Sequence, residues 1–190
     1  MRATHTITVS APLPTDLSRD DVVAMLHEHE NLMLVQPLTT KYAPMPSTPD
    51  DTLKNPYWGE KGFRETIKTY MVSESITIIP GIGEYGRKVI QFPASFQDTS
   101  DGVRTIALAA AGVIAKSHFR VMPVRSDQET NNTLKGEQGT HWILRETAQV
   151  ECAKCLMPIV KGNYEKAHRD LCSRLLEKAS QGKRGQAGSS

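Results

Sequence analysis

Residues 142–180 read WILRETAQVECAKCLMPIVKGNYEKAHRDLCSRLLEKAS, and the spacing of the apolar residues changes once within them. Up to Cys152 apolar residues mostly alternate with polar ones, which is the period of a half-buried strand. From Met157 onward they recur at steps of three and four, which is the period of an amphipathic helix. Pro158 fits the first turn of that helix, where a missing N–H leaves no bond unmade. The stretch predicts a last strand followed by one long closing helix over residues 156–180.

The segments before it predict strands and a short helical region. His5–Val9 alternates and is rich in β-branched residues, and strand patterns return in Leu38–Tyr42 and through residues 66–122. Residues 19–36 follow a capping pattern at Ser18 and predict a short helix pair. A sheet with one apolar face must bury it, and only the closing helix is long enough to cover it. We therefore predict an α+β fold, in which a curved antiparallel sheet of about seven strands wraps around the long C-terminal helix and leaves a pocket.

Length and charge narrow the classes of protein to which the chain can belong. It has 190 residues, three cysteines and a formal net charge of +2, which is too little positive charge for a typical nucleic-acid surface. We expect one domain over residues 1–180, a disordered tail over residues 181–190 and no nucleic-acid partner. No apolar run is long enough to cross a bilayer, and the first residues lack a signal-peptide core. We therefore expect a cytoplasmic protein with reduced thiols and no stable membrane insertion, and the sequence assigns no oligomeric state.

Four stretches carry a resemblance to a known superfamily. They are residues 4–14 (THTITVSAPLP), 22–38 (VVAMLHEHENLMLVQPL), 96–113 (FQDTSDGVRTIALAAAGV) and 143–171 (ILRETAQVECAKCLMPIVKGNYEKAHRDL). Together with the order of the elements, they resemble a fungal family of unknown function within the START-like, polyketide-cyclase-like (SRPBCC) helix-grip superfamily. The resemblance implies a helix-grip fold with a hydrophobic ligand cavity under the C-terminal helix. The family brings no established catalytic residues to transfer, so the chemistry has to be argued from the residues themselves.

Two carboxylates fall on strand faces that should be apolar. Alternation places Glu74 and Glu146 on the same sides as large hydrophobic residues. Burial of a carboxyl group raises its pKa, which suits general acid or base catalysis near neutral pH. Both are therefore candidate catalytic residues. Two alternatives stay open: a β-bulge turns these side chains outward, or the charges pair with Arg87, Lys88 or Arg104.

Other side chains near the predicted pocket are candidate ligand contacts. The strands supply Tyr70 and Trp142, and the apolar stripe of the closing helix includes Lys161, Tyr164 and His168. A lysine on such a stripe usually reaches out to solvent, and a lone histidine is more often a packed residue than a catalyst. We therefore expect the three helical residues to line the pocket rather than to react.

Two long loops interrupt the pattern, at residues 43–63 and 125–140. Loops of that length often have a function of their own. We expect the first to act as a lid over the pocket, with Tyr57 and Trp58 as its contacts to the ligand.

A metal site is the competing interpretation of the C-terminal stretch. Cys152 and Cys155 are separated by two residues, and His168 and Cys172 lie one helical turn apart, which is a spacing seen in zinc sites. The same residues also read as the last strand followed by the closing helix, which leaves no room for a zinc knuckle. We prefer that second interpretation, with three thiols and no metal.

Residues 81–86 spell the pattern G-x-G-x-x-G directly after a predicted strand. A dinucleotide site needs a helix to follow, since the helix amino terminus holds the pyrophosphate. Residues 87–92 read as a strand instead, so we interpret the glycines as a hairpin turn and expect no cofactor.

These features predict a protein that binds a hydrophobic small molecule in an internal cavity. The leading hypothesis is a cyclase- or dehydratase-like enzyme that acts on a polyketide or aromatic intermediate of fungal secondary metabolism, with Glu74 or Glu146 moving the proton. The alternatives are a non-catalytic carrier of lipid-like ligands and, less favoured, a zinc-binding module.

Overall fold

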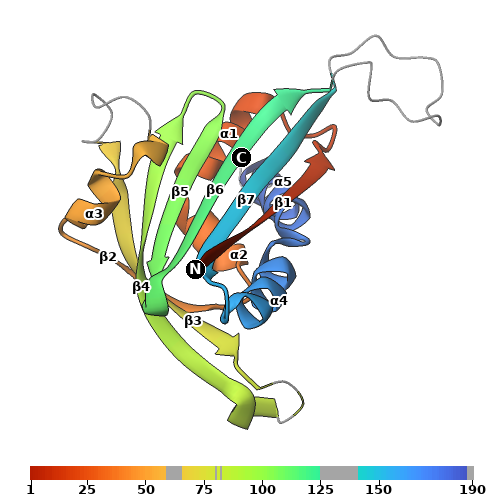
Figure 1. The fold of residues 1–190 in the computed structure, drawn as a ribbon. Helices are drawn as coiled ribbons and strands as arrows, with labels where there is room; N and C mark the ends of the chain where they lie inside the picture. Colours follow the sequence, from red (N-terminus) through yellow and green to blue (C-terminus); the bar gives the residue numbers. More distant parts are fainter. Residues whose placement is uncertain (59–65, 80, 82, 125–140, 188–190) are drawn as a thin grey trace.

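The computed structural model describes residues 1–58, 66–79, 81, 83–124 and 141–187, with side chains described as far as residue 184 (Figure 1). The predicted loop at 125–140 lies outside the described residues. In chain order the elements are β1 (Arg2–Pro12), α1 (Arg19–His27), α2 (His29–Val35), β2 (Thr39–Pro44), α3 (Asp50–Leu53), η1 (Pro56–Trp58), β3 (Lys68–Thr77), η3 (Gly83–Gly86), β4 (Arg87–Thr99), β5 (Gly102–Ala109), η4 (Ala110–Gly112), β6 (Val113–Pro123), β7 (Trp142–Ala153), α4 (Met157–His168) and α5 (Leu171–Ala187).

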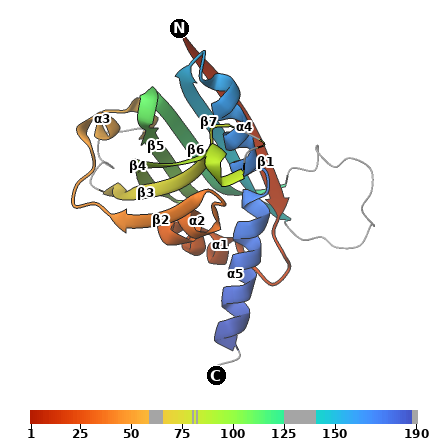
Figure 2. The same cartoon turned by 90° about the horizontal axis from the view of Figure 1, so that it is seen from below.

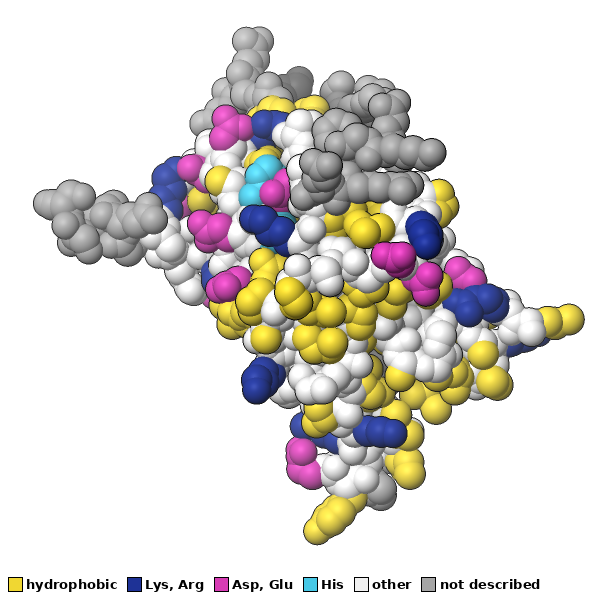
Figure 3. All heavy atoms as spheres, turned by 90° about the vertical axis from the view of Figure 1, so that its left-hand side faces the viewer, with side chains coloured by type: hydrophobic (Ala, Val, Ile, Leu, Met, Phe, Trp, Pro, Cys, Tyr) yellow, Lys and Arg dark blue, Asp and Glu magenta, His cyan; other side chains and the backbone are white. Residues whose placement is uncertain are grey.

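The strands form one seven-stranded antiparallel sheet in the order β1-β7-β6-β5-β4-β3-β2. The sheet is strongly curved, and α1, α2, α4 and α5 lie on its concave side (Figures 1 and 2). The hairpin of β3 and β4 forms the lower end of the molecule in Figures 1 and 3. The predicted α+β helix-grip fold is therefore confirmed. Among the described residues, no helix combines the length and the apolar character needed to cross a bilayer.

The closing segment differs from the prediction in two ways. It forms α4 and α5 rather than one helix, with the break at Arg169 and Asp170. The break lets the two parts take separate paths: α4 contacts β1, β3 and β7, whereas α5 contacts β1, β7, α1 and α2. Both parts contact β1 and β7, but the contact with β3 comes from α4 and the contacts with α1 and α2 come from α5.

Helix α5 also continues to Ala187 instead of ending near Gly182. A glycine inside a helix costs only about 0.5–1 kcal/mol relative to alanine, so other contacts outweigh it. Lys183 forms an ion pair with Asp21 at 2.6 Å, and Arg184 forms one with Asp16 at 3.4 Å. These pairs hold the last turns of α5 against the start of α1.

The main core lies between the concave face, α1, α2 and α5. Val22 and Leu26 of α1, Leu144 of β7 and Leu175 of α5 are all fully buried within it. Burial of each such side chain contributes about 1.5–3 kcal/mol. The predicted cap at Ser18 is present: its hydroxyl accepts from the Asp21 N–H, and the Asp21 carboxylate accepts from the Ser18 N–H.

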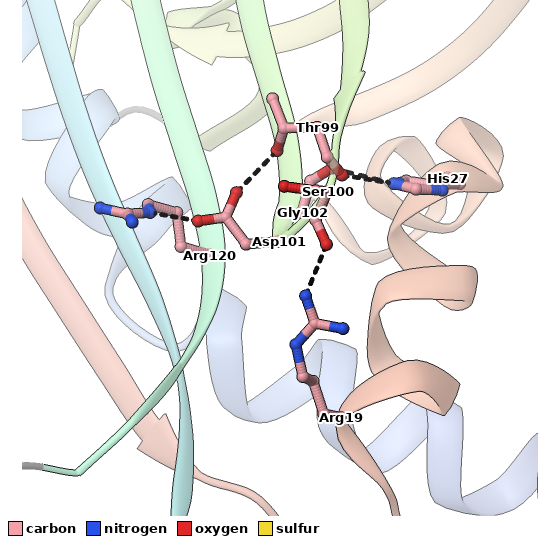
Figure 4. A network of polar contacts seen from close by, with 7 residues as sticks. All are labelled: Arg19, His27, Thr99, Ser100, Asp101, Gly102 and Arg120. Atoms are coloured by element: carbon pink, nitrogen blue, oxygen red, sulfur yellow. Dashed lines mark hydrogen bonds and ion pairs between the residues drawn. The ribbon is translucent and has the colours of Figure 1, made fainter.

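A polar network fastens α1 to the turn between β4 and β5 (Figure 4). The Nε2 atom of His27 lies 3.1 Å and 3.0 Å from the carbonyl oxygens of Thr99 and Gly102. Arg19 donates from Nη2 to the carbonyl of Ser100 at 2.6 Å. Because the backbone at this turn receives donors from α1, the helix is held in a fixed place over one end of the concave face.

The outer face of the sheet has a small core of its own. Trp58 is 2% exposed and packs against Ile67 and Ile106, and its Nε1–H donates to the carbonyl of Thr52 at 2.7 Å. Tyr57 lies between Arg104 and Lys116, whose charged groups are 6.0 Å and 5.7 Å from its ring centre.

The lid prediction for Tyr57 and Trp58 is therefore wrong. Alternation along β5 turns Val103 toward the main core and Ile106 to the opposite side, where Ile106 needs a cover of its own. The segment that contains α3 and η1 provides that cover, away from the helices of the concave side (Figure 2).

Gly102 generates the first testable prediction. It begins β5 so close to β6 that an added Cβ would lie 2.0 Å from the carbonyl oxygen of Phe119. Gly102→Ala should therefore lower the free energy of unfolding by about 2 kcal/mol or more, because the backbone has to move.

Gly162→Ala in α4 is the matched control, since nothing lies within 4 Å of its Cβ position. The control should be more stable than wild type by about 0.5–1 kcal/mol. Urea unfolding measures both, and equal midpoints for Gly102→Ala and wild type would contradict the close approach.

Candidate functional site

A cavity of about 430 Å³ lies between the concave face of the sheet, α2 and α4. Most of its wall is apolar and comes from inward-facing strand residues and from one side of each helix: Leu32, Met33, Val72, Ile76, Ile90, Phe92, Phe96, Ala107, Ala115, Phe119, Val150, Val160 and Leu171. The polar residues of the wall are Gln36, Thr39, Glu74, Lys88, Thr105, Ser117, Asn163, Tyr164 and His168. A volume of this size and a lining of this kind are typical of sites for small organic ligands.

A buried hydrogen bond joins the sheet to the end of α4 beside this cavity. Glu146 of β7 is fully buried, and its Oε1 lies 2.6 Å from Nδ1 of His168. When Nδ1 donates to the carboxylate, a neutral imidazole carries its lone pair on Nε2. His168 lines the cavity, so Nε2 is the ring nitrogen that can serve a ligand. The second carboxylate oxygen of Glu146 has no partner among the described residues.

Tyr164 stands next to this pair on α4. Its ring lies 4.3 Å from the His168 ring, centre to centre. Burial raises the pKa of the Tyr164 phenol, the charge of Glu146 raises it further, and the nearby Ser117 hydroxyl opposes the shift. The phenol therefore stays protonated across the physiological range and is a hydrogen-bond donor for a ligand.

Glu74 lines the cavity from β3, which lies near the opposite edge of the sheet from β7, the strand of Glu146. Its neighbours in register are Thr39 of β2 and Ile90 of β4. Burial raises the pKa of the Glu74 carboxyl, and the charge of His168 opposes that shift. A carboxyl in such a place is protonated at higher pH than an ordinary glutamic acid, which suits a general acid.

The two alternatives considered for the glutamates do not describe their surroundings. Both side chains point to the concave side. A register shift does occur beside Glu74, between Thr39 and Lys41 in the pairing of β2 with β3, but the extra residue lies on β2 and the pairing of β3 with β4 is regular through Glu74. The pairing of β6 with β7 is regular at Glu146. Arg87 forms an ion pair with Glu84, and Arg104 lies on the outer face against Tyr57. Lys88 shares the cavity wall with Glu74, but no ion pair joins them within the described residues.

The predicted ligand contacts separate into two groups. Tyr164 and His168 line the cavity. Tyr70 instead packs against Phe96 and the buried His29, with ring centres 5.6 Å and 6.1 Å away. Trp142 lies below the guanidinium of Arg19, and Lys161 is half exposed and reaches toward Glu165 at 3.8 Å. These three, together with Tyr57 and Trp58, are outside the cavity wall formed by the described residues.

Sequence reasoning missed six polar wall residues: Gln36, Thr39, Lys88, Thr105, Ser117 and Asn163. Lys88 alternates with Ile90 and Phe92 along β4, so the period of that strand already placed it on the concave side. No pattern in the sequence indicated Asn163. Its side chain accepts from the Thr77 N–H at 3.1 Å and donates to the Thr77 carbonyl at 2.9 Å. That pair of bonds holds α4 to the end of β3, a contact that only the fold creates.

The residues of the zinc pattern are not gathered into a metal site. Cys152 is buried in β7, Cys155 is exposed in the following turn, and Cys172 is buried beside the backbone of Val9. His168 is bonded to Glu146 instead. In the part of the chain that the structure describes, no three side chains of His, Cys, Asp or Glu are arranged to hold a metal.

The glycine pattern forms a hairpin turn, as predicted. Gly81 and Gly83 have φ values of +92° and +61°, which favour glycine, and β4 begins directly after η3. No helix follows that could hold a pyrophosphate at its amino terminus.

Replacement of Glu146 tests the buried pair. Glu146→Ala leaves the His168 ring without its acceptor in a buried place, so the free energy of unfolding should fall by about 3 kcal/mol. Glu151→Ala is the matched control on the same strand: Glu151 is partly exposed and pairs with Arg2 at the surface. It should cost less than about 1 kcal/mol. Chemical denaturation compares them, and similar losses for both variants would argue against a special role for the buried pair.

The curved sheet and the C-terminal helices that it grips define the helix-grip class of fold, with an apolar cavity beneath α4. Within that class, the chain belongs to the family described as "Domain of unknown function (DUF7053)", whose model matches residues 2–181. No curated protein matches the sequence at a significant level.

Solved structures share the fold at low sequence identity. The di-domain ARO/CYC protein BexL from the BE-7585A biosynthetic pathway has a TM-score of 0.53 at 9% identity, over 94% of this chain and 49% of its own. The di-domain ARO/CYC protein StfQ from the steffimycin biosynthetic pathway has a TM-score of 0.52 at 11% identity, over 96% and 52%. Ara h 8.0201 has a TM-score of 0.52 at 6% identity, over 94% and 99%. The chain thus spans about half the length of each ARO/CYC protein, and at these identities the likeness is one of fold.

Proposed function

We propose that this protein binds a hydrophobic small molecule in the cavity and acts on it as a cyclase- or dehydratase-like enzyme. The observation that carries the proposal is the placement of His168, oriented by Glu146, and of Glu74 on the wall of one apolar cavity. The substrate class is a polyketide or aromatic intermediate with carbonyl and hydroxyl groups. A place in fungal secondary metabolism belongs to the same proposal.

The apolar wall supplies the binding energy. Burial of apolar ligand surface contributes about 25 cal/mol per Å², so a ligand that buries roughly 200 Å² gains about 5 kcal/mol. The polar wall residues then orient the ligand rather than hold it. Tyr164 donates to a carbonyl oxygen, and Lys88 attracts a carbonyl or carboxylate near the hairpin of β3 and β4.

Dehydration of a β-hydroxy ketone illustrates the chemistry that these groups support. Nε2 of His168 takes the proton from the carbon next to the carbonyl, and Glu146 stabilises the imidazolium that forms. The C–O bond to the hydroxyl breaks, protonated Glu74 gives its proton to the leaving oxygen, and a C=C bond and water result. Transfer of the proton from His168 to Glu74 restores both groups.

The structural neighbours support this reading only through their fold. Two of them carry the description ARO/CYC, and each contains a domain that superposes on nearly all of this chain. One fold hosts many functions, so the residues of the cavity bear the argument for chemistry.

A non-catalytic carrier is the second candidate. It is favoured by the wall itself, which is apolar over most of its extent. Such a cavity binds a ligand whether or not the ligand reacts.

Filling the cavity tests the binding half of the proposal. Ala115 lies on the cavity wall in β6, so Ala115→Phe should reduce the affinity for the fluorescent probe 1-anilinonaphthalene-8-sulfonate at least about tenfold, by occupying apolar space. Ala43→Phe, at an exposed position of β2, adds the same group outside the cavity and should leave the affinity unchanged. Fluorescence titration measures both, and equal affinities would place the probe elsewhere.

Turnover tests the catalytic half. Synthetic poly-β-ketone thioesters and a β-hydroxy ketone are incubated with the protein, and loss of water or ring closure is followed by mass spectrometry. His168→Gln and Glu74→Gln should each lower the rate about 100-fold or more, while probe binding stays within a factor of about two. Thr39→Val, which also alters the polar wall, is the control and should keep most of the rate.

The pH dependence of the rate tests the role of Glu74 as an acid. The acid form of Glu74 is the active one, and burial raises its pKa, so the wild-type rate should fall as pH rises through that raised pKa. The low residual rate of Glu74→Gln should not show this fall at high pH. Turnover that survives both substitutions would overturn the roles given to His168 and Glu74. Absence of turnover in wild type, while the probe still binds, would leave the carrier as the function.

A further inference from the structure

The hairpin between β3 and β4 exposes an unusual number of large apolar side chains. Ile78, Ile79, Tyr85 and Val89 are 38%, 55%, 95% and 59% exposed. They belong to the β3–β4 hairpin, which is the lower end of the molecule in Figure 1. In Figure 3 the lower end carries hydrophobic side chains together with cationic and acidic ones. An exposed apolar cluster of this kind usually marks an interaction surface.

This hairpin cluster, as we call Ile78, Ile79, Tyr85 and Val89, is continuous with the mouth of the cavity. Ile78 also belongs to the cavity wall. Across from it, Ile159 of α4 lines the cavity and is 42% exposed. The two bonds between Asn163 and the backbone of Thr77 hold α4 beside the base of the hairpin. An apolar path therefore runs from the hairpin cluster into the cavity.

Cationic groups border the hairpin cluster. Arg87 and Lys88 follow directly after η3, and both are exposed. Glu84 at the same turn is paired with Arg87 at 2.9 Å, so among the described side chains of the turn Lys88 supplies the uncompensated positive charge. Apolar side chains flanked by Arg and Lys are complementary to the surface of a bilayer that contains anionic lipids.

We propose that the hairpin cluster docks peripherally into the surface of an anionic lipid bilayer and presents the cavity mouth to it. The shape of the hairpin favours a bilayer over a protein. A stable protein interface needs about 800 Å² from each partner, and four side chains on a narrow projecting turn do not provide that against a flat surface. Lipid molecules surround an inserted turn on every side, so a bilayer does not need a surface complementary in shape to the hairpin.

This inference rests on the proposed function, because the inference names the source of the ligand that the cavity is proposed to bind. A molecule that enters through an apolar mouth docked on a bilayer is one that partitions into the bilayer, with an apolar body and a small polar end. Such a molecule matches a cavity whose wall is apolar, with its acid and base groups on the wall among apolar side chains.

Vesicle co-sedimentation tests the docking. Wild type should sediment with vesicles of phosphatidylcholine and phosphatidylserine, more weakly with phosphatidylcholine alone, and less as salt concentration rises. The double variant Ile79→Glu, Tyr85→Glu should lose binding to the mixed vesicles at least about tenfold. Leu34→Glu is the matched control, since Leu34 of α2 is 59% exposed and lies outside the hairpin cluster. It should bind vesicles like wild type.

Probe binding in solution separates this proposal from the previous one. Wild type and the double variant should bind 1-anilinonaphthalene-8-sulfonate equally, because neither substituted residue lines the cavity wall. If probe binding is normal but wild type does not sediment, or the double variant sediments like wild type, the docking proposal is overturned and the cavity function stands. If vesicles are bound but the probe is not, the ligand cavity fails instead. Cross-linking of the hairpin cluster to a protein, without vesicle binding, also overturns docking on lipid.

Discussion

A fully buried carboxylate in the middle of a sheet requires a partner, and Glu146 obtains one from the last residue of α4. This bond has consequences beyond its own energy. It places the carboxyl end of α4 over β7, while the bonds of Asn163 to Thr77 attach the same helix to β3. Because α4 is attached to β7 and to β3, the helix crosses the concave face and does not pack directly against all of it. The cavity is the space that remains beneath.

The chemistry of the site follows from the same arrangement. In the tautomer in which Nδ1 of His168 donates to Glu146, Nε2 is left as an acceptor, and the ring of Tyr164 packs beside the imidazole. Glu74 lines the same cavity as His168 but comes from β3, and the charge of His168 acts on its carboxyl group. The mouth lies between the β3–β4 hairpin and α4, so the elements that hold the catalytic candidates also form the entrance. Under the proposed function, binding, reaction and access all depend on the two contacts that join α4 to the sheet.

Much of the fold was predictable because strand period is a local property. The alternation that put Glu74 and Glu146 among apolar residues depends only on their own strands, and both side chains indeed point to the concave side. The glycines at 81 and 83 could be assigned to a turn because a strand, not a helix, follows them. The same local reasoning failed for Trp58, since a buried tryptophan in a loop does not say which face of the sheet it covers. It also failed for Lys161, which lies on the helical stripe but reaches toward Glu165 rather than into the cavity.

The sequence by itself determined the strands, the position of the closing helical segment and the face on which each strand residue lies, because those features depend on periods of two and of three to four residues. It also placed Glu74 and Glu146 on strand faces shared with large apolar residues, while leaving open whether a bulge or a charged partner changes their surroundings. Only the tertiary structure decided that His168 would be the partner of Glu146, that the closing segment would break at residues 169 and 170, and that Tyr57 and Trp58 would cover the outer face. Those outcomes depend on contacts between residues far apart in the chain, and no spacing within one segment encodes such distances.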